Sequence, residues 1–108
     1  MGSKLSYRFA PKALGDLEET LRYIEQDLSN PKAAEDLAVK LFEKIDTVRA
    51  FPDSGHKVEN VYMADRSLRR FVVDNYVVFY KPDEAEHTII IVRIVFGARN
   101  LNEILKQD

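Results

Sequence analysis

The arginines in the second half of the chain are the residues whose placement most favours a chemical or binding role. Five lie within or beside stretches with strand-like sequence, namely Arg66, Arg69, Arg70, Arg93 and Arg99. A guanidinium group makes paired hydrogen bonds to phosphate and carboxylate groups. If these strands form a meander, the side chains can converge on one sheet surface. We therefore expect an effector or nucleic-acid surface, with Arg70 and Arg99 as candidate catalytic residues.

Arg93 interrupts an otherwise apolar stretch. A charge buried without a partner is very costly, so this side chain must pair, extend to solvent or face a solvated groove. An ion pair with Asp65, Asp74 or Glu59 is one interpretation, and a place on the effector surface is the other. For Arg69, a solvated strand face is the simpler interpretation, although it too can contribute to that surface.

Tyr76 is the aromatic candidate for the same surface, and it shares one predicted strand with Phe79 and Tyr80. A tyrosine beside guanidinium groups can stack on a base or donate a proton. Aromatic residues on a central strand also commonly belong to the core, so both interpretations of Tyr76 remain open.

The sequence gives little support for metal, cofactor or nucleophilic chemistry. It has no cysteine, and the two histidines, His56 and His87, lack the spacing of a metal site. Ser54 lies in a glycine-containing loop, where turn formation explains it. No glycine-rich phosphate loop is present. We therefore expect neither a cofactor nor a bound metal.

Length and charge set further bounds. The 108 residues suit one domain, and the opening Met1-Gly2-Ser3 is typical of a cloning remnant. No apolar run is long enough to span a membrane, and we expect a cytoplasmic protein. The net charge of −2 lacks the basic excess of a dedicated nucleic-acid binder. Any nucleic-acid role must therefore depend on a local patch.

The first half of the chain is expected to position these residues through a helical hairpin. Residues 5–9 alternate like a short strand. Residues 11–28 and 31–50 carry apolar side chains at helical spacing. Asn30 and Pro31 suit the N-cap and first turn of the second helix. The short connection makes the two helices antiparallel neighbours.

The second half is expected to form the sheet. Strands are predicted over residues 68–73, 76–81 and 88–96, with a further strand over 58–63. Loops are predicted over residues 51–55, 74–75 and 82–86, and a short helix or tail near residues 101–105. The strand at 88–96 is apolar on both faces and is expected to be central. Strict alternation places Arg93 with Ile89, Ile91 and Val95. The order β-α-α-β-β-β predicts an α+β fold, with the helical hairpin on a mainly antiparallel twisted sheet.

Four segments in this order resemble a known family. Residues 68–80 place a basic residue in one strand and a Tyr-x-x-x-Tyr in the next, and residues 92–99 end a strand with Gly-x-Arg. Residues 10–17 and 51–55 also match. Together these segments resemble the RelE/ParE superfamily of toxins from bacterial type II toxin–antitoxin systems. The resemblance covers residues 5 to 105.

This resemblance implies a small β-α-α-β-β-β toxin that a cognate antitoxin neutralises. It also implies one of two targets, DNA gyrase for ParE-like members or ribosome-bound messenger RNA for RelE-like members. RelE-like nucleases use several basic residues; Arg70 and Arg99 match two of their positions, whereas Leu68 and Val77 occupy two others.

The C-terminal tyrosine or histidine found in many RelE-like nucleases is also missing, because its position falls near Leu105 and no Tyr or His follows His87. These departures favour a gyrase-directed toxin. The alternative is a metal-independent endoribonuclease, so the sequence leaves open whether the chain is an enzyme. A third reading is a binding module that has lost toxicity.

Overall fold

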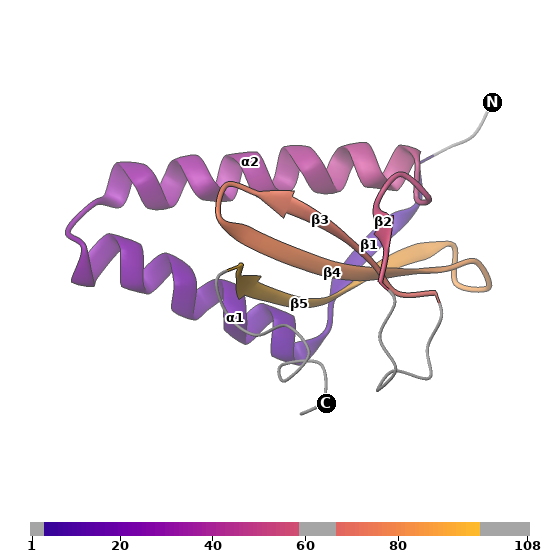
Figure 1. Cartoon of the computed structure of the whole chain (residues 1–108), viewed down its shortest axis with the longest axis horizontal. Helices are drawn as coiled ribbons and strands as arrows, with labels where there is room; N and C mark the ends of the chain where they lie inside the picture. Colours follow the sequence, from indigo (N-terminus) through magenta and orange to yellow (C-terminus); the bar gives the residue numbers. More distant parts are fainter. Residues whose placement is uncertain (1–3, 59–66, 98–108) are drawn as a thin grey trace.

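The computed structural model describes residues 4–58 and 67–97, which form two α-helices packed on one face of a five-stranded sheet. In chain order the elements are β1 (Ser6–Phe9), α1 (Pro11–Arg22), the π-helix η1 (Tyr23–Asp27), α2 (Pro31–Ala50), β2 (His56–Lys57), β3 (Arg69–Val73), β4 (Tyr76–Asp83) and β5 (Thr88–Phe96). Figure 1 shows the helices side by side, running in opposite directions. This α+β architecture confirms the predicted fold class.

The helical hairpin forms where the apolar spacing predicted it. Asn30 caps α2, because its side-chain oxygen accepts a hydrogen bond from the backbone N–H of Ala33 at 3.1 Å. The first helix was predicted to stay α-helical to residue 28, but its last turn winds as η1. The wider turn shifts the helical phase, so Ile24 is buried while Leu28 is exposed.

The sheet has the strand order β1-β5-β4-β3-β2. β1 runs parallel to β5, and the other neighbours are antiparallel. The prediction that residues 88–96 form a central strand is confirmed, since β5 lies between β1 and β4. β1 pairs only with Thr88–Ile91 of β5. The second half of β5 therefore has no strand on that side among the described residues.

An extra residue in β5 interrupts the alternation of side chains. Phe79 of β4 pairs with Arg93, but the next residue, Tyr80, pairs with Ile91. Val92 is therefore the additional residue of a β-bulge. A one-residue bulge reverses which face the following side chains occupy.

This reversal corrects one prediction from strict alternation. Ile89 and Ile91 pack in the core beneath the helices, and Ile94 joins them, although alternation had placed Ile94 on the other face. Arg93 and Val95 do not share the face of Ile89 and Ile91 as predicted, since Val95 packs in a separate cluster.

Two apolar clusters occupy the two faces of the sheet. The larger one joins the helices to the helix-facing side chains of β3, β4 and β5. The smaller one contains Leu68, Val77, Phe79 and Val95. We call the sheet face that carries this smaller cluster the outer face, because neither α1 nor α2 contributes to it.

Two features of the strands differ from or go beyond the prediction. β2, at His56–Lys57, was not predicted, and the strand expected at 58–63 stays a prediction because residues 59–63 lie outside the described part of the chain. β4 extends to Asp83, although Pro82 was predicted to end it. Alternate residues of β4 direct their backbone N–H groups toward β3, and Pro82 occupies one of these positions. The β3–β4 pairing ends at Tyr80, so the missing N–H of Pro82 costs no strand hydrogen bond.

The expected C-terminal helix near 101–105 also falls outside the described residues. None of the described helices combines the length and apolar character needed to cross a membrane.

Candidate functional surface

Arg70 lies on the outer face, in a row of residues that crosses three strands. It pairs with Phe79 of β4, which pairs in turn with Arg93 of β5. Neighbouring strands are about 4.8 Å apart, so the backbones at Arg70 and Arg93 are roughly 10 Å apart. On its other side Arg70 pairs with His56 of β2. Directly opposed residues project to the same face, so an imidazole lies beside this guanidinium group.

Arg93 is held by a carboxylate from α1. Its Nε donates to Asp16 Oδ2 at 2.8 Å, and its Nη2 donates to Asp16 Oδ1 at 3.2 Å. Asp16 Oδ2 also accepts a hydrogen bond from the backbone N–H of Ile94 at 3.0 Å. Arg93 is only 9% exposed. The ion-pair interpretation thus describes Arg93 well, although the partner is Asp16 rather than the three carboxylates that the sequence suggested.

Arg69 holds the loop before β2. Its Nη1 donates to the backbone oxygens of Gly55 at 2.8 Å and Asp53 at 3.1 Å. Its Nε lies 3.6 Å from a carboxylate oxygen of Asp53. Adjacent strand residues project to opposite faces, so Arg69 and Arg70 do not point to one surface. The prediction that Arg69 lies on a solvated strand face is therefore only partly correct, because its guanidinium group also bonds to this loop.

Tyr80 fixes the same loop from beneath. Its hydroxyl donates to the backbone oxygen of Pro52 at 2.7 Å and accepts from the backbone N–H of Gly55 at 2.9 Å. Burial raises the pKa of the Tyr80 phenol, against the lowering effect of the Gly55 hydrogen bond. A Cβ on Gly55 would lie 2.5 Å from the Tyr80 oxygen, so glycine is required at this contact.

Tyr76 belongs to the helix-facing side of the sheet. It packs against the larger core cluster and meets Phe96 edge to face, with ring centroids 5.7 Å apart. Burial is the main cause that raises the pKa of its phenol. The structure therefore separates Tyr76 from Arg70, which lies on the outer face.

The outer face keeps only part of the predicted arginine group. Arg70 and Arg93 share its central row, while Arg66 and Arg99 lie outside the described residues. Among the residues the structure describes, no cluster of three or more acidic, histidine or cysteine side chains could hold a metal ion. The described part of the outer face carries guanidinium groups and one imidazole beside an apolar cluster.

Sequence reasoning missed two residues of this arrangement. His56 was interpreted as an isolated surface histidine, because its pairing with Arg70 joins strands that are separated by eleven residues in the sequence, 58–68. Asp16 carried a signal that could have been used. It lies three residues after the buried Ala13 and directly before the buried Leu17, so it borders the apolar stripe of α1.

The sequence model of a known protein family matches most of the chain. A model described as the ParE toxin of the type II toxin–antitoxin system, parDE, matches residues 7–101. The chain belongs to this family. It is a type II toxin–antitoxin toxin of the ParE/RelE kind. No curated protein sequence matches it significantly.

Solved structures share the fold of this ParE-family toxin. A chain of the chromosomal ParDE toxin–antitoxin system from P. aeruginosa has a TM-score of 0.63 and 16% identity, covering 84% of this chain and 94% of that chain. A chain of the RelBE2 toxin–antitoxin complex from Mycobacterium tuberculosis has a TM-score of 0.59 and 15% identity, covering 87% and 99%. A chain of the archaeal RelE–RelB complex from Pyrococcus horikoshii has a TM-score of 0.60 and 18% identity, covering 91% and 100%.

Proposed function

We propose that this ParE-family toxin stops bacterial growth by acting on DNA gyrase rather than by cleaving messenger RNA. The observation that carries this choice is the apolar character of the outer face around Arg70. Leu68 and Val77 stand where the resembling nucleases place basic residues, and they are 1% and 6% exposed within the outer-face cluster. Stabilising the charge of a phosphoryl-transfer transition state needs several preorganised cationic groups. A buried valine and leucine supply none.

A protein target is compatible with the same face. Arg70 is half-buried and adjoins an apolar cluster, which is the composition of the anchor points that dominate protein interfaces. We assign Arg70, with Arg66 and Arg99, to the contact with gyrase. Arg69 and Arg93 act differently, because they hold the loop at residues 52–55 and helix α1 in place.

The second candidate is the ribosome-dependent endoribonuclease, and one contact favours it. His56 pairs directly with Arg70, which puts a possible general base beside a phosphate-binding guanidinium group. This reading makes the chain a metal-independent enzyme in which His56 takes the proton of a ribose 2′-hydroxyl. It predicts that His56→Ala abolishes toxicity, whereas the gyrase reading predicts a small effect.

The partner we propose is a cognate antitoxin that covers the toxin and neutralises it. The similar solved chains come from toxin–antitoxin systems or complexes. Several large apolar side chains are exposed on the helical hairpin, including Leu14, Tyr23, Val39 and Phe42. Exposed apolar surface of this kind fits a partner that buries it.

The test is controlled expression in bacteria, with an SOS reporter and a measurement of gyrase-bound cleaved DNA. We expect growth arrest with SOS induction and accumulation of cleavage complexes, both lost in Arg70→Ala and Arg99→Ala. The matched control is Arg22→Ala, which removes an exposed arginine from α1 and should stay toxic. Cut messenger RNA without SOS induction would establish the nuclease reading instead. Absence of any growth defect from the unaltered toxin in its native host would refute both.

A further inference from the structure

Phe51 is the most exposed of the large apolar side chains that the structure describes, at 67%. It follows α2 directly, and it opens the loop that joins α2 to β2 (Figure 1). One exposed apolar residue is common on a protein surface and indicates nothing by itself. Phe51 differs from such residues because its backbone, its helix and the loop behind it are each held by specific contacts.

The backbone of Phe51 is hydrogen-bonded on both sides. Its N–H donates to the oxygen of Thr47, in the last turn of α2, at 3.1 Å. Its oxygen accepts a hydrogen bond from the N–H of Ser54 at 2.9 Å, which closes a tight turn over residues 51–54. Pro52 occupies the second position of this turn, where its fixed φ suits the geometry. The backbone from which the Phe51 ring projects is therefore fixed before any partner binds.

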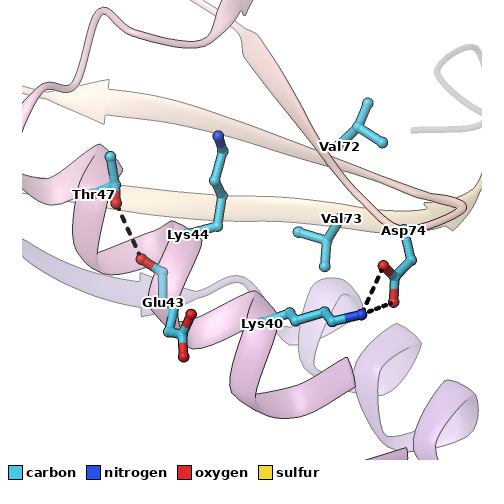
Figure 2. Close-up of a pocket in the computed structure, with 7 residues that line it drawn as sticks. All are labelled: Lys40, Glu43, Lys44, Thr47, Val72, Val73 and Asp74. Carbon is cyan, nitrogen blue, oxygen red and sulfur yellow. Dashed lines mark hydrogen bonds and ion pairs between the residues drawn. The ribbon is translucent and has the colours of Figure 1, made fainter. Parts of the chain in front are cut away.

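The helix end that carries Phe51 is fixed to the sheet. Ile45 and Val48 are each 1% exposed and belong to the core cluster beneath the helices. Further along α2, the Lys40 ammonium group contacts both carboxylate oxygens of Asp74, at 3.2 and 3.4 Å, and so joins the helix to the turn after β3 (Figure 2). Phe51 thus has a defined place relative to the strands as well as to α2.

The rest of the loop is held by two side chains from the sheet. Tyr80 and Arg69 together bond backbone groups of three loop residues. Gly55 lies against β3, because an added Cβ would stand 2.8 Å from the backbone oxygen of Arg70. His56 follows directly and pairs with Arg70. The loop that begins at the exposed ring therefore continues into the surface that carries Arg70.

The chemistry around Phe51 favours a protein as its partner. An aromatic ring on a fixed backbone loses little freedom when it enters an apolar pocket, so most of its burial contributes to affinity. Aromatic residues and arginine are both enriched at the centres of protein interfaces. The turn at residues 51–54 contributes one carboxylate, that of Asp53, which is 85% exposed, and it contains no cation. It therefore offers no favourable charge to the phosphates of a nucleic acid.

We propose that the turn at residues 51–54 is a second contact with gyrase, in which Phe51 enters an apolar pocket of that protein. Arg69 and Tyr80 are positioning residues for this contact, because they act through the loop that they hold. Gyrase is the occupant that the observations favour, since the loop adjoins Arg70, which we assign to the same target. The inference rests on the proposed function and adds a contact that is separate from Arg70.

The experiment measures how much purified toxin is needed for gyrase to accumulate cleaved plasmid DNA in the presence of ATP. Phe51→Ala should raise the half-maximal toxin concentration at least about tenfold, through loss of the buried ring. Phe51→Leu keeps most of the apolar surface and should lose less. The matched control is Lys44→Ala, which truncates an exposed side chain on the same helix and should act like the unaltered toxin. Circular dichroism verifies that each variant is folded.

A double-mutant cycle separates positioning from general stability. Tyr80→Phe removes the hydroxyl that bonds Pro52 and Gly55, and at a temperature where it is folded it should raise the half-maximal concentration at least about threefold. In toxin that already carries Phe51→Ala, the same change should have little further effect, because it acts through the lost ring. An equal loss in both backgrounds would show that Tyr80 only stabilises the fold and would contradict its positioning role.

Three results would overturn the contact, and each has a different meaning. Equal half-maximal concentrations for Phe51→Ala and the unaltered toxin would remove this contact and leave the assignment of Arg70 intact. Loss of neutralisation by the antitoxin in Phe51→Ala, without a change in DNA cleavage, would assign the turn to the antitoxin instead. If the unaltered toxin produces no cleaved DNA with gyrase, the proposed function fails and this contact fails with it.

Discussion

Replacing Asp16 with alanine tests whether the buried ion pair between α1 and β5 organises this end of the sheet. The side chains of Arg93 and Asp16 are 11% and 15% exposed, and Asp16 also accepts the N–H of Ile94. Removing one member of a buried pair leaves the other charge without a partner, which costs about 3–5 kcal/mol. This energy range also covers the loss of the hydrogen bond from the Ile94 N–H to Asp16, because the contributions of groups in contact do not simply add.

The assay is urea unfolding followed by circular dichroism. A domain of this size has a free energy of unfolding of about 5–15 kcal/mol, so a loss of about 3–5 kcal/mol in Asp16→Ala should lower the urea midpoint clearly. A thermal scan of the same variant should show a melting temperature lower by about 12 °C or more. Asp16→Asn keeps an acceptor for Ile94 and should lose less. The double variant Asp16→Leu with Arg93→Met removes both charges and should recover most of the stability.

The matched control is the exposed pair between Lys32 and Asp36 on α2, with a distance of 2.8 Å. Asp36→Ala should cost no more than about 0.5 kcal/mol, because solvent screens a surface pair. If Asp16→Ala costs as little as this control, the pair does not organise the sheet and the reasoning is refuted.

Three further changes have definite expected outcomes, each measured by urea unfolding. Gly55→Ala places a Cβ 2.5 Å from the Tyr80 oxygen and should cost about 2 kcal/mol or more, whereas Gly15→Ala, with nothing within 4 Å, should stabilise α1 by up to about 1 kcal/mol. An equal effect at both glycines would contradict the close contact. Tyr80→Phe removes the hydroxyl that bonds the loop and should cost about 1–3 kcal/mol. Burial raises the pKa of this phenol above 10.0, so its neutral form stabilises the fold below pH 10.0 and that contribution is lost as the pH rises through the raised pKa. The unaltered toxin should therefore lose stability at alkaline pH more steeply than Tyr80→Phe, and parallel pH profiles would exclude this cause. Asn30→Ala should cost about 1 kcal/mol through loss of the α2 cap, and no change would mean that the cap hydrogen bond contributes nothing.

The parts of the fold predicted from sequence are those set by local rules. The helical hairpin follows from apolar spacing and from the Asn30 cap, and α2 spans the predicted residues. The turn between β3 and β4 follows from Asp74 and Asn75, and Asp74 adopts the positive φ of 52° that hairpin turns favour. Both features depend on residues close together in the chain.

The features that sequence missed depend on contacts between distant residues. Asp16 and Arg93 are 77 positions apart, and no local rule selects this carboxylate over others. The bulge at Val92 also left no recognisable mark, because valine suits a regular strand equally well. Its effect was nevertheless large, since it decided which face Arg93 and Ile94 occupy.

The candidate surface was predicted in part. Alternation correctly grouped Arg70 with Leu68, since Arg70 pairs with Phe79 and both Phe79 and Leu68 belong to the outer face. The sequence analysis expected the arginines to converge on one sheet surface, but the described ones do not all do so. Arg69 instead donates hydrogen bonds to the loop at residues 53–55. Charge alone could not separate a guanidinium group that binds a target from one that holds a loop.

Pulse labelling of DNA and protein synthesis immediately after induction of the toxin tests the central claim most directly. Poisoning of gyrase predicts that incorporation of labelled thymidine falls first, while incorporation of labelled methionine continues through the early minutes. An immediate fall in methionine incorporation, with thymidine incorporation sustained, would contradict the gyrase-directed account and establish messenger RNA as the target.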